Sequence, residues 1–385
     1  TYRLNFGNNF RTDKRYFSSI FDAGQTGRAF KDDQTYYDYT LDNIVNYNNT
    51  FGKHEVGATL LYGSIKREFN STFAEARGFS RLTLSYNDLA LGTNQFANSD
   101  GWNEALLYQM ARLNYKFDNK YLVTATVRRD GFSGFAKNNK TAIFPTVALG
   151  WILSEEGFMQ NMKAIELLKL RVGYGVIGNQ TSRYSSIASL TTSAAYVFGD
   201  GGTTAFGQQV NRLGNDNLKW ERTKGLNIGL DFSLFDGKTQ GTLDAYNNDT
   251  YDLLFSVAIP SITGFDNITT NLGQINNKGF EASITQHILN KLDFSWSASL
   301  VFSANKNKIV TLTGQDANDD GIEDDLISSG LFIGKSISTI YDYLANGVYD
   351  LDDTRLPGFP VGSMSVLDQN GDGDITPAGD RVFLG

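Results

Sequence analysis

Long stretches of the chain alternate apolar and polar residues with a period of two. Between residues 292 and 303 the sequence LDFSWSASLVFS places Leu, Phe, Trp, Ala, Leu and Phe at one set of alternate positions and mostly Asp and Ser at the other. Similar alternation occupies residues 121–128, 168–174, 226–234 and 280–285. Because successive side chains of a strand point to opposite faces, each segment predicts a β-strand with one apolar and one polar face.

The length of these segments separates two all-β architectures. A soluble antiparallel sandwich would bury its apolar faces, whereas a transmembrane barrel turns them toward lipid and its polar faces toward the lumen. Strands of globular proteins are most often ~5–6 residues long, and strands that cross a membrane need ~9–11. Several of the alternating stretches are longer than this. We therefore predict an all-β fold, an antiparallel transmembrane β-barrel.

The connections between the predicted strands are of two kinds. Short connections, rich in Gly, Asn and Asp, alternate along the chain with long polar ones. Since Gly, Asn and Asp tolerate the positive φ of tight hairpins, the short connections predict turns. Alternation of short periplasmic turns with long extracellular loops is typical of outer-membrane barrels. The short connections are 51–53, 117–120, 235–238 and 289–291, and the long ones are about 11–33, 68–103, 179–218, 253–273 and 310–339.

One connection, 155–166, is longer than the other predicted turns. Its place in the alternation puts it on the periplasmic side, where we expect it to contain one helical turn. No run approaches the ~18 consecutive apolar residues that a membrane helix requires.

Composition narrows the functional classes. The chain has 385 residues, no Cys, two His and a formal net charge of -8. The lack of Cys excludes disulfides and thiolate metal sites, and the acidic balance argues against a nucleic-acid partner. With two His and no carboxylate pair that the sequence places on one cleft, nothing predicts a catalytic triad, a zinc site or a glycosidase. We expect a protein that is not an enzyme.

Two sets of residues on the predicted strands need interpretation. Charged residues on the polar faces are expected to face a plug or water in the lumen rather than to form a specific solute site; they are Arg128, Lys169, Arg171, Asp231 and Asp244. Tryptophans near strand ends predict an interfacial aromatic girdle; they are Trp151, Trp220 and Trp296.

A glycine pattern in the middle of the chain resembles a dinucleotide-binding motif. Gly173, Gly175 and Gly178 spell GxGxxG, but the residues that follow do not predict the helix which that motif requires. Glycines in a tightly packed or bent strand explain the pattern better.

The stretch DQNGDGDITPAGD at 368–380 resembles a calcium-binding loop. Its twelfth position is Gly, where an EF-hand needs a bidentate Glu, and no helices flank it. It is therefore not an EF-hand sensor. Oxygen-rich loops can still hold a structural Ca²⁺, which accepts six to eight oxygen ligands. The alternative is a solvated turn built from Asx residues and Gly. The candidate ligands are Asp368, Asn370, Asp372, Asp374 and Asp380.

A weaker copy of this loop lies at 316–325, with Asp316, Asn318 and Asp320 as candidate ligands. We expect structural Ca²⁺ at one or both loops and no catalytic cofactor. The chain is accordingly divided into barrel strands at 1–309 and a long loop region at 310–385, predicted to be extracellular and stiffened by the cation. The stretch from Tyr341 to Tyr349 either dips into the barrel mouth or crosses the membrane.

Five segments, in this order, resemble the SusC/RagA-type TonB-dependent transporters of Bacteroidetes outer membranes. The most distinctive short motif is NNKGFE, and the calcium-like loop matches the Asp/Asn/Gly-rich segment near the family's C-terminus. The resemblance covers most of the chain, from about residue 34 onward. The five segments are 121–131 followed by 144–151 and 154–156, 168–179, 217–221, 276–281, and 368–380 preceded by Gly347-Val348-Tyr349.

The resemblance implies a barrel of ~22 strands with an N-terminal plug, multi-pass in the bacterial cell outer membrane. It further implies import of a glycan or peptide nutrient together with a SusD-like surface lipoprotein, powered by TonB through an N-terminal region. No plug, TonB box or terminal strand is found in the sequence, so we expect the middle and later part of a longer polypeptide.

Two other functions stay open. The first is a barrel that scaffolds a larger outer-membrane assembly without importing anything. The second and more remote is a secreted, calcium-stiffened β-adhesin that is soluble without detergent.

Overall fold

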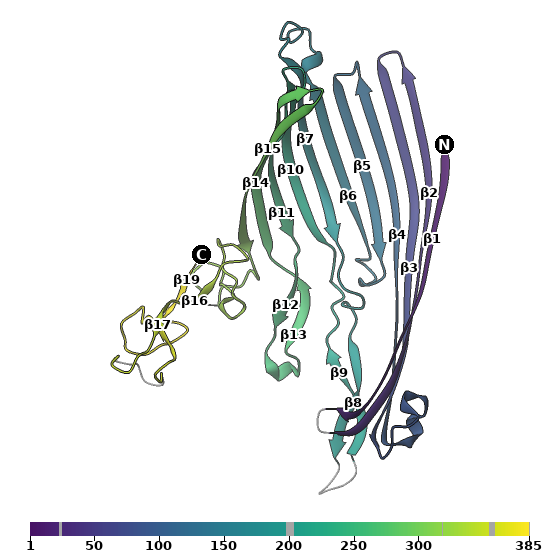
Figure 1. Ribbon diagram of the computed structural model, residues 1–385, viewed down its shortest axis with the longest axis vertical. Coiled ribbons are helices and arrows are strands. Elements are labelled where there is room, and N and C mark those ends of the chain that lie inside the picture. Colours follow the sequence, from purple (N-terminus) through teal and green to yellow (C-terminus); the bar gives the residue numbers. More distant parts are fainter. Residues whose placement is uncertain (23–24, 198–203, 318, 354–358, 385) are drawn as a thin grey trace.

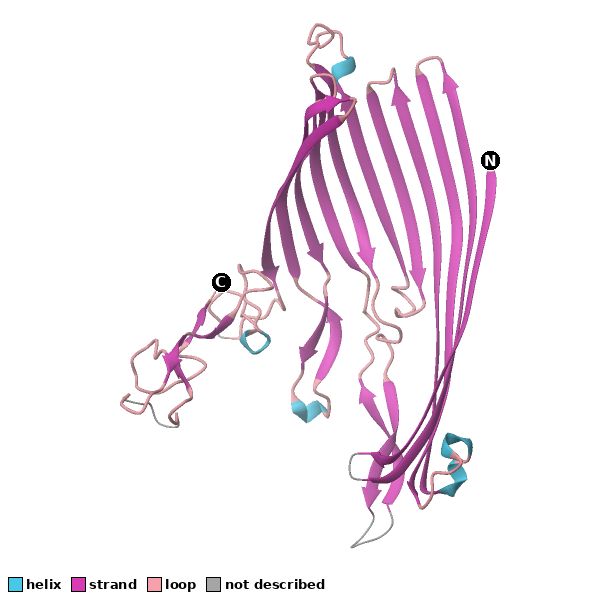
Figure 2. Ribbon diagram, viewed as in Figure 1, coloured by secondary structure: helices cyan, strands magenta, loops and turns pink. Residues whose placement is uncertain are grey.

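The computed structural model describes residues 1–22, 25–197, 204–317, 319–353 and 359–384. Its main body is one antiparallel sheet of eleven strands that follow one another along the chain, in the order β1-β2-β3-β4-β5-β6-β7-β10-β11-β14-β15 (Figures 1 and 2). Four two-stranded sheets lie outside it. The predicted all-β, antiparallel architecture is confirmed.

The strands of the main sheet are longest at its N-terminal side. Their bounds are β1 Tyr2–Asp22, β2 Gln25–Phe51, β3 His54–Phe79, β4 Gly92–Phe117, β5 Tyr121–Phe132, β6 Thr141–Ile152, β7 Ile165–Asn179, β10 Glu221–Leu234, β11 Thr239–Tyr251, β14 Gln274–Lys291 and β15 Phe294–Thr311.

The smaller sheets are hairpins or short pairs, and the helical elements are single 3-10 turns. The strand pairs are β8 Ser189–Val197 with β9 Thr204–Arg212, β12 Leu254–Ala258 with β13 Asn267–Asn271, β16 Tyr341–Tyr343 with β19 Arg381–Phe383, and β17 Ala345–Val348 with β18 Met364–Val366. The 3-10 turns are η1 Ser85–Asn87, η2 Leu89–Leu91, η3 Leu153–Glu155, η4 Ser261–Thr263 and η5 Ile327–Ser329. Within the described ranges, no helix is long and apolar enough to cross a membrane.

The tight turns that the structure describes between strands of the main sheet lie at one end of the sheet, uppermost in Figure 1, which we name the short-turn end. The backbone takes positive φ there at Gly52, at Asp118 and Asn119, and at Phe235 to Gly237, as predicted for tight hairpins. The last turn lies at 292–293 rather than 289–291, because β14 continues to Lys291.

The longer connection 153–164 also lies at the short-turn end, as its parity predicted, and η3 is its expected helical turn (Figure 2). Its last residue hydrogen-bonds to the neighbouring turn, since the Phe235 N–H donates to the Ala164 carbonyl.

The opposite end, which we name the long-loop end, corrects the sequence prediction in one respect. Residues 11–33 and 68–103 were expected to be polar loops, but most of them extend β1 to β4 to lengths of 21–27 residues. Cross-strand side-chain contacts stabilise this extension: the Phe17 and Phe30 rings lie 5.4 Å apart, and Arg15 pairs with the buried Asp32. Both faces of the extension carry polar residues, so no simple alternation marks it in the sequence.

In the predicted loop region 310–385, the described residues that follow the end of β15 at Thr311 form a separate cluster of short elements. Ile309 and Leu312 are buried with Ile275 and anchor it to the main sheet. The stretch 341–349 does not cross a membrane: β16 and β17 are three and four residues long and pair with β19 and β18 of the same cluster.

The sheet curves but does not close. Among the described residues, β1 pairs with β2 alone and β15 with β14 alone, so this chain supplies eleven wall strands of the ~22 that the resemblance implied.

Candidate functional site

The strand register divides the sheet into two chemically distinct faces. One continuous row of paired residues runs across nine strands and is apolar throughout. The next row, shifted by one residue, points to the other face and consists of polar or small residues. The first row is Val56, Tyr115, Val123, Leu149, Val172, Ile228, Ala245, Phe280 and Ala304; the second is Gly57, Asn114, Thr124, Ala148, Gly173, Asn227, Tyr246, Gly279 and Asn305.

The apolar face suits lipid and the polar face a lumen. Large side chains of the apolar face, such as Leu149 and Phe302, are about half exposed because nothing in the described part of the chain covers them. A soluble domain would bury so extensive an apolar surface. We name the two sides of the sheet the outer face and the lumen face.

Aromatic rings collect on the outer face near the short-turn end. Phe117, Tyr121 and Trp151 lie in adjacent positions on β4 to β6, with ring centroids 6.3 and 6.4 Å apart. Trp296 is exposed near the same end of β15. Two of the three predicted girdle tryptophans are therefore confirmed, since aromatic side chains favour the membrane–water interface.

Trp220 is not part of the girdle, which corrects the sequence prediction. It is buried at the long-loop end, 5.0 Å from the Phe135 ring and 5.6 Å from the ring of Phe144, which faces the lumen. Its indole N–H donates to the Lys140 carbonyl. A tryptophan ring near a strand end suits both the membrane–water interface and a buried aromatic cluster. The position of Trp220 in the sequence therefore did not show which of the two it occupies.

A first polar network on the lumen face joins strands β2, β4 and β5. The Tyr108 hydroxyl donates to Asp42 Oδ1 at 2.5 Å, and the Arg128 guanidinium lies 4.6 Å from the Tyr108 ring centre. Arg128 also pairs with the buried Asp130 at 2.8 Å. Tyr108 reaches Asp42 across Gly63 of β3, where a Cβ would come within 2.3 Å of the ring.

In a second network, further along the sheet, a long side chain again passes over a glycine to reach its partner. Arg171 on β7 bonds Asp231 on β10 at 2.8 Å and Asp244 on β11 at 3.1 Å. Lys169 lies 3.8 Å from Asp231. The Arg171 side chain crosses Gly229, where a Cβ would be 2.6 Å from its Nη2. The five charged residues predicted to face the lumen all lie on that face, and four of them form this network.

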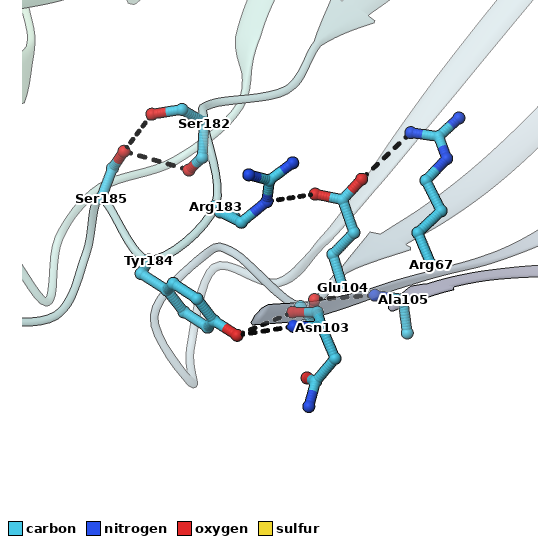
Figure 3. A network of polar contacts seen from close by, with 9 residues as sticks. Arg67, Asn103, Glu104, Ala105, Ser182, Arg183, Tyr184 and Ser185 are labelled. Carbon is cyan, nitrogen blue, oxygen red and sulfur yellow. Dashed lines mark hydrogen bonds and ion pairs between the residues drawn. The ribbon is translucent and has the colours of Figure 1, made fainter. Parts of the chain in front are cut away.

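A third network fastens the segment after β7 to the wall (Figure 3). Glu104 on β4 is buried and accepts from Arg67 at 3.0 Å and from Arg183 at 3.2 Å, the two guanidinium groups approaching from opposite sides. The Arg183 guanidinium also lies 3.4 Å from the Trp102 ring centre. The Tyr184 hydroxyl bonds the backbone of Asn103 as both donor and acceptor.

Sequence reasoning missed Asp42, Tyr108, Glu104 and Arg183. The pairs that they form are 66 and 79 residues apart in the chain, and only the strand register brings them together. The available signal was a glycine within an alternating strand, as at Gly63, which marks a position where a neighbour's side chain passes over the backbone.

The GxGxxG glycines lie within β7, as the strand interpretation predicted. The Phe144 ring occupies the space beside Gly178, where a Cβ would be 2.1 Å from Cζ. Close approach of a neighbouring side chain explains this glycine without a nucleotide.

The calcium-like loop at 368–380 folds around its own carboxylates. Asp368 accepts from the backbone N–H groups of Gly371 and Gly373. Asp380 is fully buried and accepts from those of Gln369 and Thr376. Hydrogen bonds from the backbone, that of Thr376 foremost, lower the pKa of the Asp380 carboxyl.

The other candidate ligands of this loop take part in the same kind of turn. Asp372 accepts from the Asp374 N–H and from the Asn370 side-chain amide. Asn370 accepts in turn from the Asp372 N–H, and Asp374 is exposed.

The weaker copy at 316–325 is built likewise. Asp316 accepts from the N–H groups of Asp320 and Gly321, while Asn318 lies outside the described residues. Burial alone would raise the pKa of the nearby Glu323 carboxyl, but hydrogen bonds from Thr311 and from backbone N–H groups lower it overall. Among the residues that the structure describes, no group of three or more His, Cys, Asp or Glu side chains is placed to hold a metal ion. The calcium assignment stays a prediction of the sequence.

An antiparallel wall with an apolar outer face, an aromatic girdle and a polar lumen face defines a transmembrane β-barrel of the outer-membrane class. Comparison with known families agrees: residues 1–380 match the family described as TonB dependent receptor-like, beta-barrel. The chain belongs to this family.

Relatives of known sequence extend the match across nearly the whole chain. It is 34% identical over 385 residues to TonB-dependent receptor P3 of Formosa agariphila, covering 94% of this chain and 37% of that relative. It is 34% identical over 382 residues to TonB-dependent receptor SusC of Bacteroides thetaiotaomicron, covering 95% and 36%. The chain thus spans little more than a third of the length of these relatives.

Solved structures share the fold. The structure of the RagAB peptide transporter superposes with a TM-score of 0.77 at 22% identity, over 100% of this chain and 41% of that one. The RagAB peptide importer in its open-open state gives 0.76 at 22% identity, over 100% and 41%.

Proposed function

We propose that this chain forms part of the barrel wall of a SusC-like transporter, which imports a nutrient across the outer membrane with energy from TonB. The observation that carries the proposal is the division of a family-matched wall into an outer apolar face and a polar lumen face. Such a wall excludes lipid from a hydrated passage. The short-turn end is then periplasmic and the long-loop end extracellular.

The lumen face is suited to solutes that form hydrogen bonds. Its middle rows present amides, hydroxyls and glycines, and the charges of the Arg128 and Arg171 networks are paired with one another. A paired charge leaves little net field to trap an ion. We propose a glycan or peptide nutrient, in keeping with the SusC relative and with the RagAB structures, which are described as those of a peptide transporter.

The long-loop end provides the surface for a partner. The β1–β4 extension, the β8–β9 and β12–β13 hairpins and the 310–385 cluster all project there (Figure 1). We propose that a SusD-like surface lipoprotein covers this end and delivers the nutrient. Transport lowers no chemical barrier, so the protein needs no catalytic residues in this role.

The test begins with the native full-length protein, purified from outer membranes in a mild detergent, with intact masses of everything that copurifies. The proposal expects one SusD-like lipoprotein per barrel. A barrel with several unrelated partners and no lipoprotein would support the scaffold instead, and a chain that stays soluble without detergent would support the adhesin.

Uptake then separates import from mere association. Cells with and without the intact gene are given labelled oligosaccharides or labelled peptides, in a host with or without TonB. Import predicts accumulation of one class that needs both the gene and TonB. Equal accumulation in all strains would overturn the proposal.

A further inference from the structure

The motif NNKGFE at 276–281 contains a lysine that has no role in the proposed transport. Lys278 on β14 lies directly opposite Lys306 on β15, and Lys308 follows two residues later. All three side chains are exposed. Because like charges directly opposite each other on neighbouring strands destabilise a sheet, this arrangement favours a bound anion.

The three lysines belong to the outer face. Lys278 is two residues from Phe280, and Lys306 is four residues from Phe302, so each shares a face with an exposed aromatic ring. The register between β14 and β15 is unbroken from Ile275 to His287. No bulge therefore turns the lysines toward the lumen.

The position of the three lysines along the membrane normal matches the second edge of the apolar band on the outer face. Trp296 marks the girdle at the short-turn end, and Lys306 lies ten residues further along the same strand. At about 3.4 Å per residue and a tilt of roughly 35–45°, this spans about 26 Å along the membrane normal. An outer-membrane barrel carries an apolar band about 25 Å tall, so the lysines lie at the level of the opposite headgroups.

No side chain in the described part of this chain neutralises these charges. Among the described residues, none of the three lysines forms an ion pair or a cation–π contact. On the same face of the neighbouring strand, Asp249 accepts hydrogen bonds from the side-chain amides of Gln274 and Asn276 instead.

We propose that Lys278 and Lys306, supported by Lys308, bind the phosphate of a lipid headgroup in the outer leaflet. Directly paired residues have Cβ atoms about 4.5–5.5 Å apart, so two ammonium groups can reach the oxygens of one phosphate. Lysine binds phosphate as a point charge, and its long stem keeps the ammonium at the interface while the methylenes lie along the apolar belt. Clustered lysines beside a membrane span attract anionic lipid.

The inference rests on the proposed orientation, in which the long-loop end is outside. It does not depend on whether the barrel imports a nutrient. Binding is measured on the purified protein and uptake on cells, so either result stands if the other fails.

The experiment uses the full-length protein in a neutral detergent, titrated with diphosphoryl lipid A, with its dephosphorylated form, and with inorganic phosphate. The variant K278Q/K306Q removes the pair. K238Q/K291Q removes two lysines at the short-turn end as a charge-matched control, and K278R/K306R keeps the charge. Native mass spectrometry and thermophoresis report binding, and a thermal melt confirms that each variant is folded.

We expect K278Q/K306Q to bind diphosphoryl lipid A roughly 30-fold more weakly, since each lysine near an anionic surface contributes about a factor of five. The other two variants should stay close to wild type, and dephosphorylated lipid A should not distinguish any of them. Unchanged affinity of K278Q/K306Q, or an equal loss in K238Q/K291Q, would overturn the proposal. Displacement of the lipid by inorganic phosphate at similar concentration would show a free-anion site and would also overturn it.

Discussion

Replacing Gly63 by alanine should destabilise the wall by about 2–5 kcal/mol. A Cβ there would lie 2.3 Å from Tyr108 Cε2 and 2.5 Å from Asp42 Oδ1, far inside the roughly 3.5 Å of a favourable contact. The ring must move off Asp42, which costs a charge-assisted hydrogen bond of about 1.5–3 kcal/mol and about 1–3 kcal/mol of overpacking. Lower backbone entropy in the unfolded chain offsets about 0.5–1 kcal/mol.

The assay is a double-mutant cycle on the free energy of unfolding. In a Tyr108→Ala background the ring is gone, and the Asp42 carboxylate, released from its hydrogen bond to Tyr108, can rotate away from the new Cβ. Gly63→Ala should then be neutral or stabilising by up to about 1 kcal/mol. The sign of the effect therefore reverses with the ring, giving a coupling energy that only direct contact explains. Guanidinium unfolding of the full-length protein in micelles provides the energies, and hydrogen exchange of β3 and β4 peptides locates the change.

Gly173→Ala is the matched control. Gly173 lies on the lumen face of β7, and a Cβ there would meet nothing within 4 Å. Alanine should be tolerated at that position or slightly stabilising. If Gly173→Ala proves as costly as Gly63→Ala, or if Gly63→Ala costs the same with and without the Tyr108 ring, the steric reasoning is refuted.

Two further predictions concern the connections. Hydrogen bonds from Tyr121 and Trp151 lower the pKa of the Glu156 carboxyl, so its anchoring of the 153–164 connection should persist at neutral pH and be lost as the pH falls through that lowered pKa. Hydrogen exchange of the connection, corrected for intrinsic rates, should become faster in wild type as the pH falls through that pKa. The same acceleration in Glu156→Gln would contradict the prediction. Arg183→Met should speed exchange at 180–188 roughly 5- to 30-fold, because Glu104 loses one charged partner; unchanged exchange would mean that this contact does not hold the segment.

The sequence was sufficient for the wall itself. Period-two alternation shows which side chains share a face, because successive side chains of a strand point to opposite faces. Phe294 and Trp296 could therefore be assigned to the apolar face of a strand before any pairing was known. The tight turns were also readable, since positive φ at Gly52 and Asn119 depends on local chemistry.

The sequence was insufficient to predict strands that carry polar residues on both faces. The β1–β4 extension looks like polar loop, because cross-strand contacts such as Arg15 with Asp32 have no signature in either strand alone. Trp220 shows the same limit for a single residue. Its position near a strand end was correct, but whether the ring meets lipid or the Phe135 and Phe144 rings depends on the path of the loop that carries it.

The sequence by itself thus determined the class of the fold, the two faces of its strands and the tight turns at the short-turn end, all of which follow from neighbouring residues along the chain. Only the tertiary structure decided which lumen side chains meet, that Tyr108 passes over Gly63 to Asp42, and that Lys278 stands opposite Lys306. The reason is register: sliding one strand by a single residue exchanges its faces, and a slide of two residues changes every partner, while the alternation in the sequence stays the same.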